Sequence, residues 1–183
     1  MSRLHPTPGQ TVGPFFGYAL PYDRGHELVP PGHPGAKQLH GTVYDGAGAP
    51  VPDALLELWQ PDADGTVVQQ PGSLHRDGFT FTGWGRAATD NAGHYSFTTV
   101  EPGPVDGARG FFAITVFARG LLDRLFTRAY LDPDAPFLAS LPADRRDTLL
   151  VQREHGALRF DLHLQGPRET VFLRHSGHTG LHG

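Results

Sequence analysis

The sequence contains no cysteine among its 183 residues, so disulfide bonds, zinc–thiolate sites and thiol nucleophiles are all excluded. Positive charge is not in excess either. The formal net charge is −4, which offers no electrostatic footprint for nucleic acid. No apolar run approaches the roughly 20 residues that a membrane-spanning helix needs. The first eight residues lack the apolar segment of a signal peptide. These absences favour a soluble, cytoplasmic protein.

Glycine and proline, in contrast, are abundant, with 24 and 17 residues respectively. They lie between apolar runs, as the turn residues of a β-rich fold do, and do not form low-complexity tracts. A chain of this length fits one domain with a sizeable core. We therefore expect a single domain over residues 1–183, in which 1–37 form an extended arm and 174–183 a flexible tail.

Alternating and β-branched segments predict roughly eight strands. The strongest is Phe111–Ala118, which we expect to be central, with Leu125–Leu131 as its antiparallel partner. The other expected strands cover residues 41–45, 54–60, 94–100, 158–164 and 169–173, with an irregular strand or covering loop at 79–86. One short helix is expected over Ser140–Leu150, which begins with a cap, an early proline and an early acid. This pattern predicts a mainly β fold, a two-sheet β-sandwich.

The stretch from Gly41 to Val67 consists of two strands separated by a Gly/Pro turn, followed by a loop of small and acidic residues. A strand that opens into a loop at the rim of a sandwich is a common place for a functional site. Asp62 and Asp64 in this loop resemble part of a calcium loop, but the remaining ligand positions and the terminal glutamate are missing. We therefore interpret them as solvated turn carboxylates.

Eleven histidines suggest a metal site, but their placement does not support one. One regularly spaced set lies in a Gly-rich terminal tail without a scaffold, and the other in a stretch whose prolines forbid a helix. These sets are His175, His178 and His182, and His26, His33 and His40. Motifs for a serine nucleophile, a P-loop and a dinucleotide site are absent. The residues alone reveal no catalytic set.

The extended arm contains an aromatic segment, residues 11–18, that is too apolar for a free tail. Exposure of Phe15, Phe16 and Tyr18 to water would cost free energy. The arm therefore packs either on a partner or back on its own core, and composition leaves both alternatives open.

Several segments, in the same order along the chain, resemble the intradiol ring-cleaving dioxygenases. They are Ala54–Gly65, Thr89–Pro104 and Ala118–Tyr130. Members of that family are β-sandwich enzymes that bind ferric iron through two tyrosines and two histidines. A further set of segments resembles the iron-free alpha subunits of the heteromeric members that cleave protocatechuate, namely Thr11–Phe16, Ala118–Gly120, Thr127–Tyr130 and Gln165–Phe172.

At the four positions where the resemblance places the iron ligands, this sequence has other residues. They are Val67, Val105, Ala113 and Thr115. Valine and alanine cannot coordinate iron, and a lone threonine hydroxyl cannot replace imidazoles and phenolates. We therefore expect no metal site in this chain. The resemblance implies that a homologous beta subunit binds the Fe³⁺.

The resemblance also implies an active site at the contact between the two subunits, with no catalytic residue in this chain. Thr11, Gly13 and Pro14 would line the substrate pocket, since a small and a rigid residue allow close approach to a flat ligand. Arg128 would offer its guanidinium to the substrate carboxylate or to a loop of the partner. Alternatively, Arg128 lies in an ordinary surface ion pair.

The implied reaction inserts both atoms of O₂ into protocatechuate to give 3-carboxy-cis,cis-muconate, a step of aromatic catabolism in the β-ketoadipate pathway. A different interpretation is a transthyretin-like or regulatory β-sandwich that acts as a binding module. The strand, G-x-P-V turn and strand within Gly41–Leu58 recur in such domains. That interpretation explains neither the aromatic arm nor the segment Gln165–Phe172.

Overall fold

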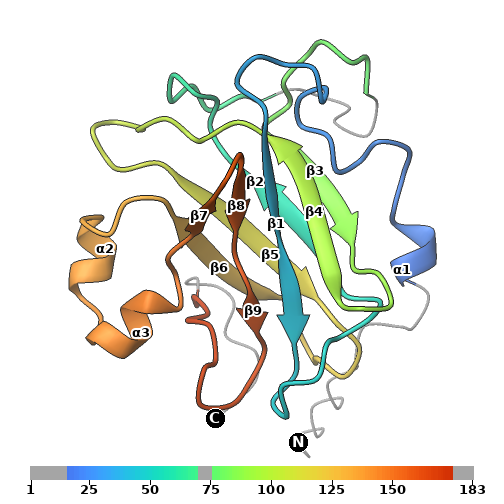
Figure 1. Ribbon diagram of the computed structural model, residues 1–183, viewed down its shortest axis with the longest axis vertical. Helices are drawn as coiled ribbons and strands as arrows, with labels where there is room; N and C mark the ends of the chain where they lie inside the picture. The colour runs from blue at the N-terminus through green and yellow to red at the C-terminus, as the bar shows by residue number, and fades with distance from the viewer. Residues whose placement is uncertain (1–15, 70–75, 175–183) are drawn as a thin grey trace, which may run out of the picture.

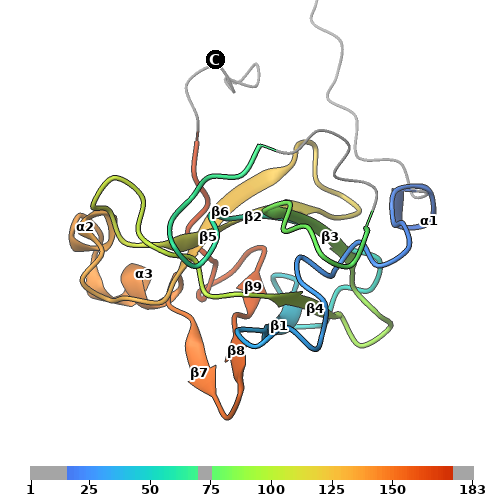
Figure 2. The ribbon, with the colours of Figure 1, turned by 90° about the horizontal axis from the view of Figure 1, so that it is seen from above.

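Two β-sheets packed face to face form the protein, which confirms the predicted sandwich (Figures 1 and 2). The structure, a computed structural model, describes residues 16–69 and 76–174. The first sheet has the order β4-β1-β8-β7, with β9 also paired to β1, and contains β1 (Lys37–Tyr44), β4 (His94–Thr99), β7 (Gln152–Glu154), β8 (Ala157–Arg159) and β9 (Leu162–His163). The second has the order β3-β2-β5-β6 and contains β2 (Leu55–Trp59), β3 (Trp84–Ala88), β5 (Phe111–Phe117) and β6 (Leu125–Tyr130).

The core lies between the sheets and is built by side chains with a period of two. In β5 the buried residues that face the core are Phe112, Ile114 and Val116, and in β4 they include Tyr95 and Phe97. As predicted, β5 is an inner strand and pairs antiparallel with β6. Since alternate residues of these strands face the core, the residues between them are directed to the outer faces of the sandwich.

The described residues contain three short helices, whereas the sequence predicted one. They are α1 (Phe16–Ala19), α2 (Pro136–Ala139) and α3 (Ala143–Asp147). Only α3 falls within the predicted segment. The prolines of the arm exclude a long helix but leave room for the single turn of α1. None of the described helices is long and apolar enough to cross a membrane.

One predicted strand, 158–164, is divided into β8 and β9. The N–H of Phe160 donates to the carbonyl oxygen of His40, but the next N–H along β1, that of Thr42, has a side-chain acceptor. The N–H of Thr42 donates to the Asp161 carboxylate at 3.0 Å. This side-chain acceptor interrupts the backbone ladder.

The C-terminal end of the described chain differs from the prediction in two further ways. The predicted strand 169–173 forms only one isolated bridge, between Leu173 and Phe126. The unpredicted β7, whose three residues are exposed, pairs with β8 as a short hairpin around Gly156. Between residues 79 and 86 the chain is a covering loop that becomes regular only at Trp84, where β3 begins.

Three turns share the pattern D-x-x-G-x, beginning at Asp45, Asp62 and Asp90. In each, the aspartate Oδ1 accepts backbone N–H groups from the second and the fourth following residue, at 2.8–3.0 Å. Each turn also closes with a hydrogen bond from the glycine N–H to the aspartate carbonyl oxygen. The carboxylate of Asp62 therefore shapes a turn, in agreement with the prediction.

The glycines of these turns, Gly48, Gly65 and Gly93, all have positive φ, at 81°, 89° and 71°. They differ in the space around them. A Cβ added at Gly48 would meet nothing within 4 Å, whereas one at Gly65 would lie 1.9 Å from the carbonyl oxygen of Pro104. Gly48 is required by its backbone conformation alone, whereas Gly65 is required by its conformation and by close packing together.

Alanine substitutions separate these two requirements. Gly48→Ala should lower the free energy of unfolding by about 1–2 kcal/mol, the cost of a left-handed conformation for an L-residue. Gly65→Ala should cost about 1–3 kcal/mol more, because the turn and the Pro104 segment must move apart. Urea unfolding of the two variants measures the difference. Equal losses would show that the close contact at Gly65 has no energetic weight.

The carboxyl group of Asp90 should contribute stability that depends on pH. The backbone N–H of His94 donates to this carboxylate and, with that of Ala92, holds its pKa below the usual value. A depressed pKa stabilises the fold above the unfolded pKa of about 3.9, and this contribution is lost as the pH falls through the folded pKa.

Asp90→Asn should therefore be less stable than the parent chain at pH 7, and the difference should shrink below about pH 4. Unfolding in urea at pH 7, 5, 4 and 3 measures it. Asp64→Asn is the control, since Asp64 donates its own N–H in such a turn but has no turn-closing carboxylate. A difference for Asp90→Asn that stays constant with pH contradicts the assignment.

Candidate functional site

The outer face of the second sheet carries aromatic and charged side chains in register. The strand pairings place four residues in a row across β3, β2, β5 and β6: Trp84, Trp59, Ala113 and Arg128. We call this the Trp59 row. The adjacent row contains Arg86, Glu57, Thr115 and Phe126. Directly opposed side chains in neighbouring strands lie about 5 Å apart, so each row forms a continuous surface.

The positions at which the resemblance places iron ligands lie on this face and at one end of it. Ala113 and Thr115 are alternate residues of β5, one in each row. Val67 follows the D-x-x-G turn after β2 and is 57% exposed. Val105 lies in the loop before β5, where it exchanges backbone hydrogen bonds with Ala108.

Close backbone packing holds the segments that bear these positions together. The N–H of Gly103 donates to the carbonyl oxygen of Asp62 at 2.8 Å, which joins the loop before β5 to the turn after β2. A Cβ at Gly110 would lie 2.1 Å from the carbonyl oxygen of Pro102, so the start of β5 also contacts this loop. The backbone segments that bear these positions therefore pack together as one frame.

The side chains on this frame do not fit ferric iron. Val67, Val105 and Ala113 carry no donor atom, and Thr115 supplies a single buried hydroxyl. Iron in an oxygen- and nitrogen-rich site needs imidazole, phenolate or carboxylate ligands. Elsewhere in residues 16–69 and 76–174, no group of three or more histidine or acidic side chains is placed to hold a metal ion. The histidines of the C-terminal tail, His175, His178 and His182, lie outside these ranges.

The charges beside Thr115 compensate each other. Arg86 and Glu57 form an ion pair of 2.6 Å in which both side chains are mostly buried, at 15% and 18% exposure. The Arg86 guanidinium also lies 5.0 Å from the ring centroid of Trp84. Sequence analysis did not identify this pair. The period of two in β2 and β3 was the available signal, because it puts Glu57 and Trp59 on one face.

Arg128 is the cationic end of the Trp59 row. Its guanidinium lies 4.4 Å from the ring centroid of Phe111 and 5.8 Å from that of Phe137, and it contacts the Tyr130 hydroxyl at 3.3 Å. Within the described part of the chain, no carboxylate forms an ion pair with it. The structure therefore does not contain the surface ion pair that was the alternative interpretation of Arg128. Aromatic rings orient the guanidinium and leave it available to an anion.

The predicted pocket residues of the arm, Thr11, Gly13 and Pro14, lie outside the described residues. The nearest described part of the arm packs on this chain's own second sheet. Tyr22 stacks on Trp84 with ring centroids 5.9 Å apart, and Arg86 donates to the carbonyl oxygen of Leu20 at 2.8 Å. Residues 20–22 therefore pack on the outer face of the second sheet, beside Trp84 of the Trp59 row.

Comparison with known proteins gives concordant results. Residues 11–115 match the family described as Dioxygenase (Dioxygenase_C). The protocatechuate 3,4-dioxygenase alpha chain of Burkholderia cepacia is 36% identical over 94% of this chain and 99% of its own length. The corresponding alpha chain of Pseudomonas putida is 36% identical over 93% and 96%. The Burkholderia cepacia beta chain is 30% identical over 85% and 76%.

Solved structures agree with the sequence relatives. The dioxygenase domain of a carbohydrate-binding fusion protein from Streptomyces sp. SirexAA-E superposes with a TM-score of 0.58 at 26% identity, over 88% of this chain and 99% of that one. The 3-chlorocatechol 1,2-dioxygenase of Rhodococcus opacus 1CP has the same fold, with a TM-score of 0.56 at 19% identity over 75% and 63%. A transthyretin-like binding module gains no support from these matches. By its sequence and its two-sheet architecture, the chain belongs to the intradiol dioxygenase family.

Proposed function

We propose that the chain is the iron-free alpha subunit of a heteromeric protocatechuate 3,4-dioxygenase. The proposal is carried by the residues Val67, Val105, Ala113 and Thr115, which stand where the resemblance places the family's iron ligands and supply neither imidazole nor phenolate. Near full-length similarity to two alpha chains supports the same assignment. A homologous beta subunit would then hold the Fe³⁺.

The partner would carry out the ring cleavage. In the proposed reaction, both atoms of O₂ are inserted between the hydroxylated carbons of protocatechuate, and 3-carboxy-cis,cis-muconate is formed. The metal of the partner would supply the activation of the catechol. The positions Val67, Val105, Ala113 and Thr115 offer no side chain that fits such a role, so the contribution of this chain would be binding and positioning. We assign the assembled enzyme to cytoplasmic aromatic catabolism, in the β-ketoadipate pathway.

Two parts of this chain would complete the substrate pocket at the subunit contact. The arm would contribute Thr11, Gly13 and Pro14, as the resemblance implies. Arg128 would contribute a guanidinium that aromatic rings already hold in place. A preoriented arginine loses little side-chain entropy when it binds a carboxylate, and it can do so with two hydrogen bonds.

The purified chain should be colourless, free of stoichiometric iron and inactive on protocatechuate. Colour in such enzymes arises from tyrosinate-to-iron charge transfer, and the ligand positions here carry no tyrosine. Visible absorbance, iron content and oxygen uptake check this. Co-expression with a homologous beta chain that contains the two tyrosine and two histidine ligands should give a complex with visible absorbance, bound iron and oxygen uptake. Stoichiometric iron and visible absorbance in the chain alone would refute the proposal.

Arg128→Gln in the assembled complex should lower kcat/KM for protocatechuate by about 10- to 100-fold, the loss of a charge-assisted hydrogen bond. Iron content should not change, and Thr11→Ala should likewise alter activity without removing iron. Catechol has no carboxylate. Comparing the activity of the variant on catechol and on protocatechuate therefore distinguishes the two contacts proposed for Arg128, the substrate carboxylate and a loop of the partner. Equal losses on both substrates would assign Arg128 to the partner's loop, and a loss confined to protocatechuate would assign it to the carboxylate.

Arg124→Gln is the matched control for this experiment, because Arg124 also lies over a phenylalanine ring, at 5.1 Å from that of Phe126. It lies outside the Trp59 row, so activity on both substrates should be retained. If Arg128→Gln leaves both kcat and KM unchanged, Arg128 has no part in the pocket.

A further inference from the structure

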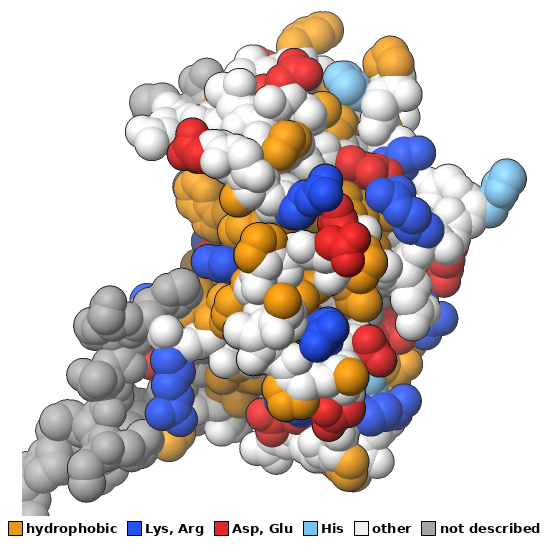
Figure 3. All heavy atoms as spheres, turned by 90° about the vertical axis from the view of Figure 1, so that its left-hand side faces the viewer, with side chains coloured by type: hydrophobic (Ala, Val, Ile, Leu, Met, Phe, Trp, Pro, Cys, Tyr) orange, Lys and Arg blue, Asp and Glu red, His pale blue; other side chains and the backbone are white. Residues whose placement is uncertain are grey.

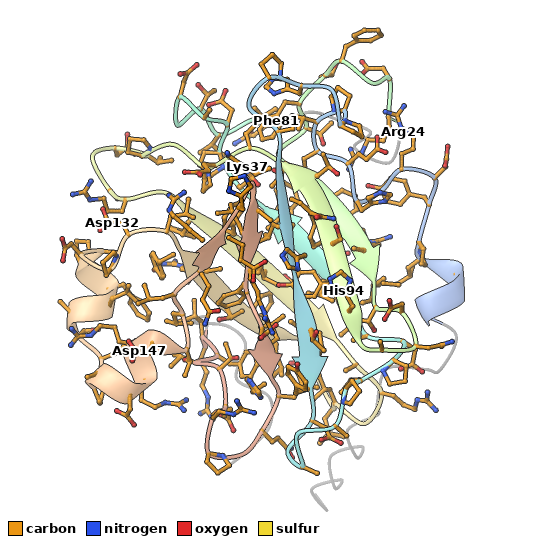
Figure 4. All side chains as sticks on the ribbon, viewed as in Figure 1. Arg24, Lys37, Phe81, His94, Asp132 and Asp147 are labelled. Carbon is orange, nitrogen blue, oxygen red and sulfur yellow. The ribbon has the colours of Figure 1, made fainter. Side chains whose placement is uncertain are left out.

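A second, smaller hydrophobic core, which we call the satellite core, lies on the outer face of the second sheet at its β6 edge. Ala129 belongs to the main core between the sheets, whereas the next residue, Tyr130, points to the other face and belongs to the satellite core. The chain between β6 and β7, which contains α2 and α3, supplies most of its side chains. Figure 3 shows the side of the molecule that carries these helices, and Figure 4 labels Asp132 and Asp147 on this part of the chain. The satellite core consists of Tyr130, Ala135, Leu138 and Leu149, with Phe111, Phe137, Leu141, Leu150 and Val171 packed against them.

The segment Gln165–Phe172, one of those that resemble the alpha subunits, closes the satellite core. The N–H of Val171 donates to the hydroxyl oxygen of Thr148 at 3.2 Å, and its carbonyl oxygen accepts from the hydroxyl of Thr127 at 2.8 Å. Thr148 follows α3, and Thr127 belongs to β6. The segment therefore ties α3 to the edge strand of the second sheet and fixes the satellite core on that sheet.

α3 and this segment, together with β8 and β9, also line a cleft of about 480 Å³. Its charged side chains are of both signs, and the guanidinium of Arg159 is already paired with Asp161 at 2.8 Å. The charges of the cleft therefore do not define one class of ligand. The satellite core, in contrast, borders the guanidinium of Arg128.

Three aromatic rings of the satellite core contact one another and Arg128. The ring centroid of Tyr130 lies 5.4 Å from that of Phe111 and 6.2 Å from that of Phe137. The Arg128 guanidinium lies 4.4 Å from the Phe111 centroid and 5.8 Å from the Phe137 centroid. Phe111 belongs to β5 and Tyr130 to β6, whereas Phe137 belongs to α2. A helix outside the sheet thus reaches the cationic end of the Trp59 row.

This environment holds the guanidinium without using up its donors. The rings attract its charge but supply no oxygen acceptor. Of the described residues, only Tyr130 offers an acceptor, its hydroxyl at 3.3 Å. The guanidinium of Arg76 is different, since it donates to the Thr82 hydroxyl at 2.8 Å and to the carbonyl oxygen of Trp84 at 2.6 Å. The described residues therefore hold Arg76 as a structural cation and leave most donors of Arg128 available to an anion.

We propose that Phe137 is a positioning residue for the reaction and acts through Arg128. The inference rests on the proposed function, because that function places Arg128 in the substrate pocket. Without the Phe137 ring, the guanidinium would be held from fewer sides and would lose more side-chain entropy when it binds an anion. In this way α2 serves the pocket through the satellite core, without contact between α2 and the substrate.

Phe137→Leu in the assembled complex tests this role, because leucine keeps the site apolar and removes the ring. The value of kcat/KM should fall by about two- to tenfold, the range for one cation–π contact. The loss should appear on the same substrates as the loss caused by Arg128→Gln. In the Arg128→Gln background, Phe137→Leu should change nothing further, because the residue through which it acts is gone. Phe137→Tyr, which keeps a ring, should retain the parent activity.

Leu141→Ala is the matched control. Leu141 packs against the same satellite core but is not one of the rings that contact Arg128. This variant should lower the melting temperature and leave kcat and KM unchanged. An equal loss of activity in Leu141→Ala, or a full additional loss when Phe137→Leu is combined with Arg128→Gln, would show that Phe137 acts only through stability and would overturn the proposal.

A measurement on the chain alone separates this proposal from the proposed function. The NMR order parameter of the Arg128 Nε–H group should fall in Phe137→Leu and stay unchanged in Leu141→Ala. An unchanged order parameter in Phe137→Leu overturns the positioning role, whether or not the complex forms. Failure of the chain to form an iron-containing complex with a beta chain contradicts the proposed function instead. An active complex in which Phe137→Leu has no effect on kcat/KM contradicts the positioning role alone.

Discussion

The burial of alternate side chains between the two sheets is the constraint on which the rest of the structure depends. Tyr95 and Phe97 of β4 face Phe112, Ile114 and Val116 of β5 across a core that excludes water. Because a strand has a period of two, a shift by one residue would expose this entire set. The same constraint directs the intervening residues outward, so the position of the candidate site follows from the core.

Strands that bury one face were predictable from sequence, since their period of two is a local property. The segments Phe111–Ala118 and Leu125–Leu131, both short and largely apolar, were predicted to be antiparallel partners, and the structure pairs them. The division of 158–164 was not predictable, because it results from Asp161 accepting the N–H of Thr42, a residue 119 positions away. Contacts between distant segments override local pattern in such places.

The candidate site was predictable only in part, and for the same physical reason. The absence of iron ligands could be stated residue by residue from the resemblance. The packing of the Gly103 loop against the turn at Asp62, and the ion pair of Arg86 with Glu57, required the fold. The cleft lined by residues of α3, of β8 and β9 and of the segment after β9 is formed by separate parts of the chain, so no contiguous sequence pattern predicts it. Backbone contacts between glycines and carbonyl groups, such as that of Gly103 with Asp62, do not depend on a metal.

The exposed ring of Trp59 has a consequence for how this chain can be observed. The sequence contains two tryptophans, and both are in the Trp59 row, with ring centroids 6.0 Å apart. Trp84 is 6% exposed, whereas Trp59 is 50% exposed. The tryptophan emission of the chain thus originates entirely on one face of the sandwich, and its solvent-sensitive part comes from one ring. Any molecule that covers that face will change the emission, so the chain carries its own optical reporter of assembly.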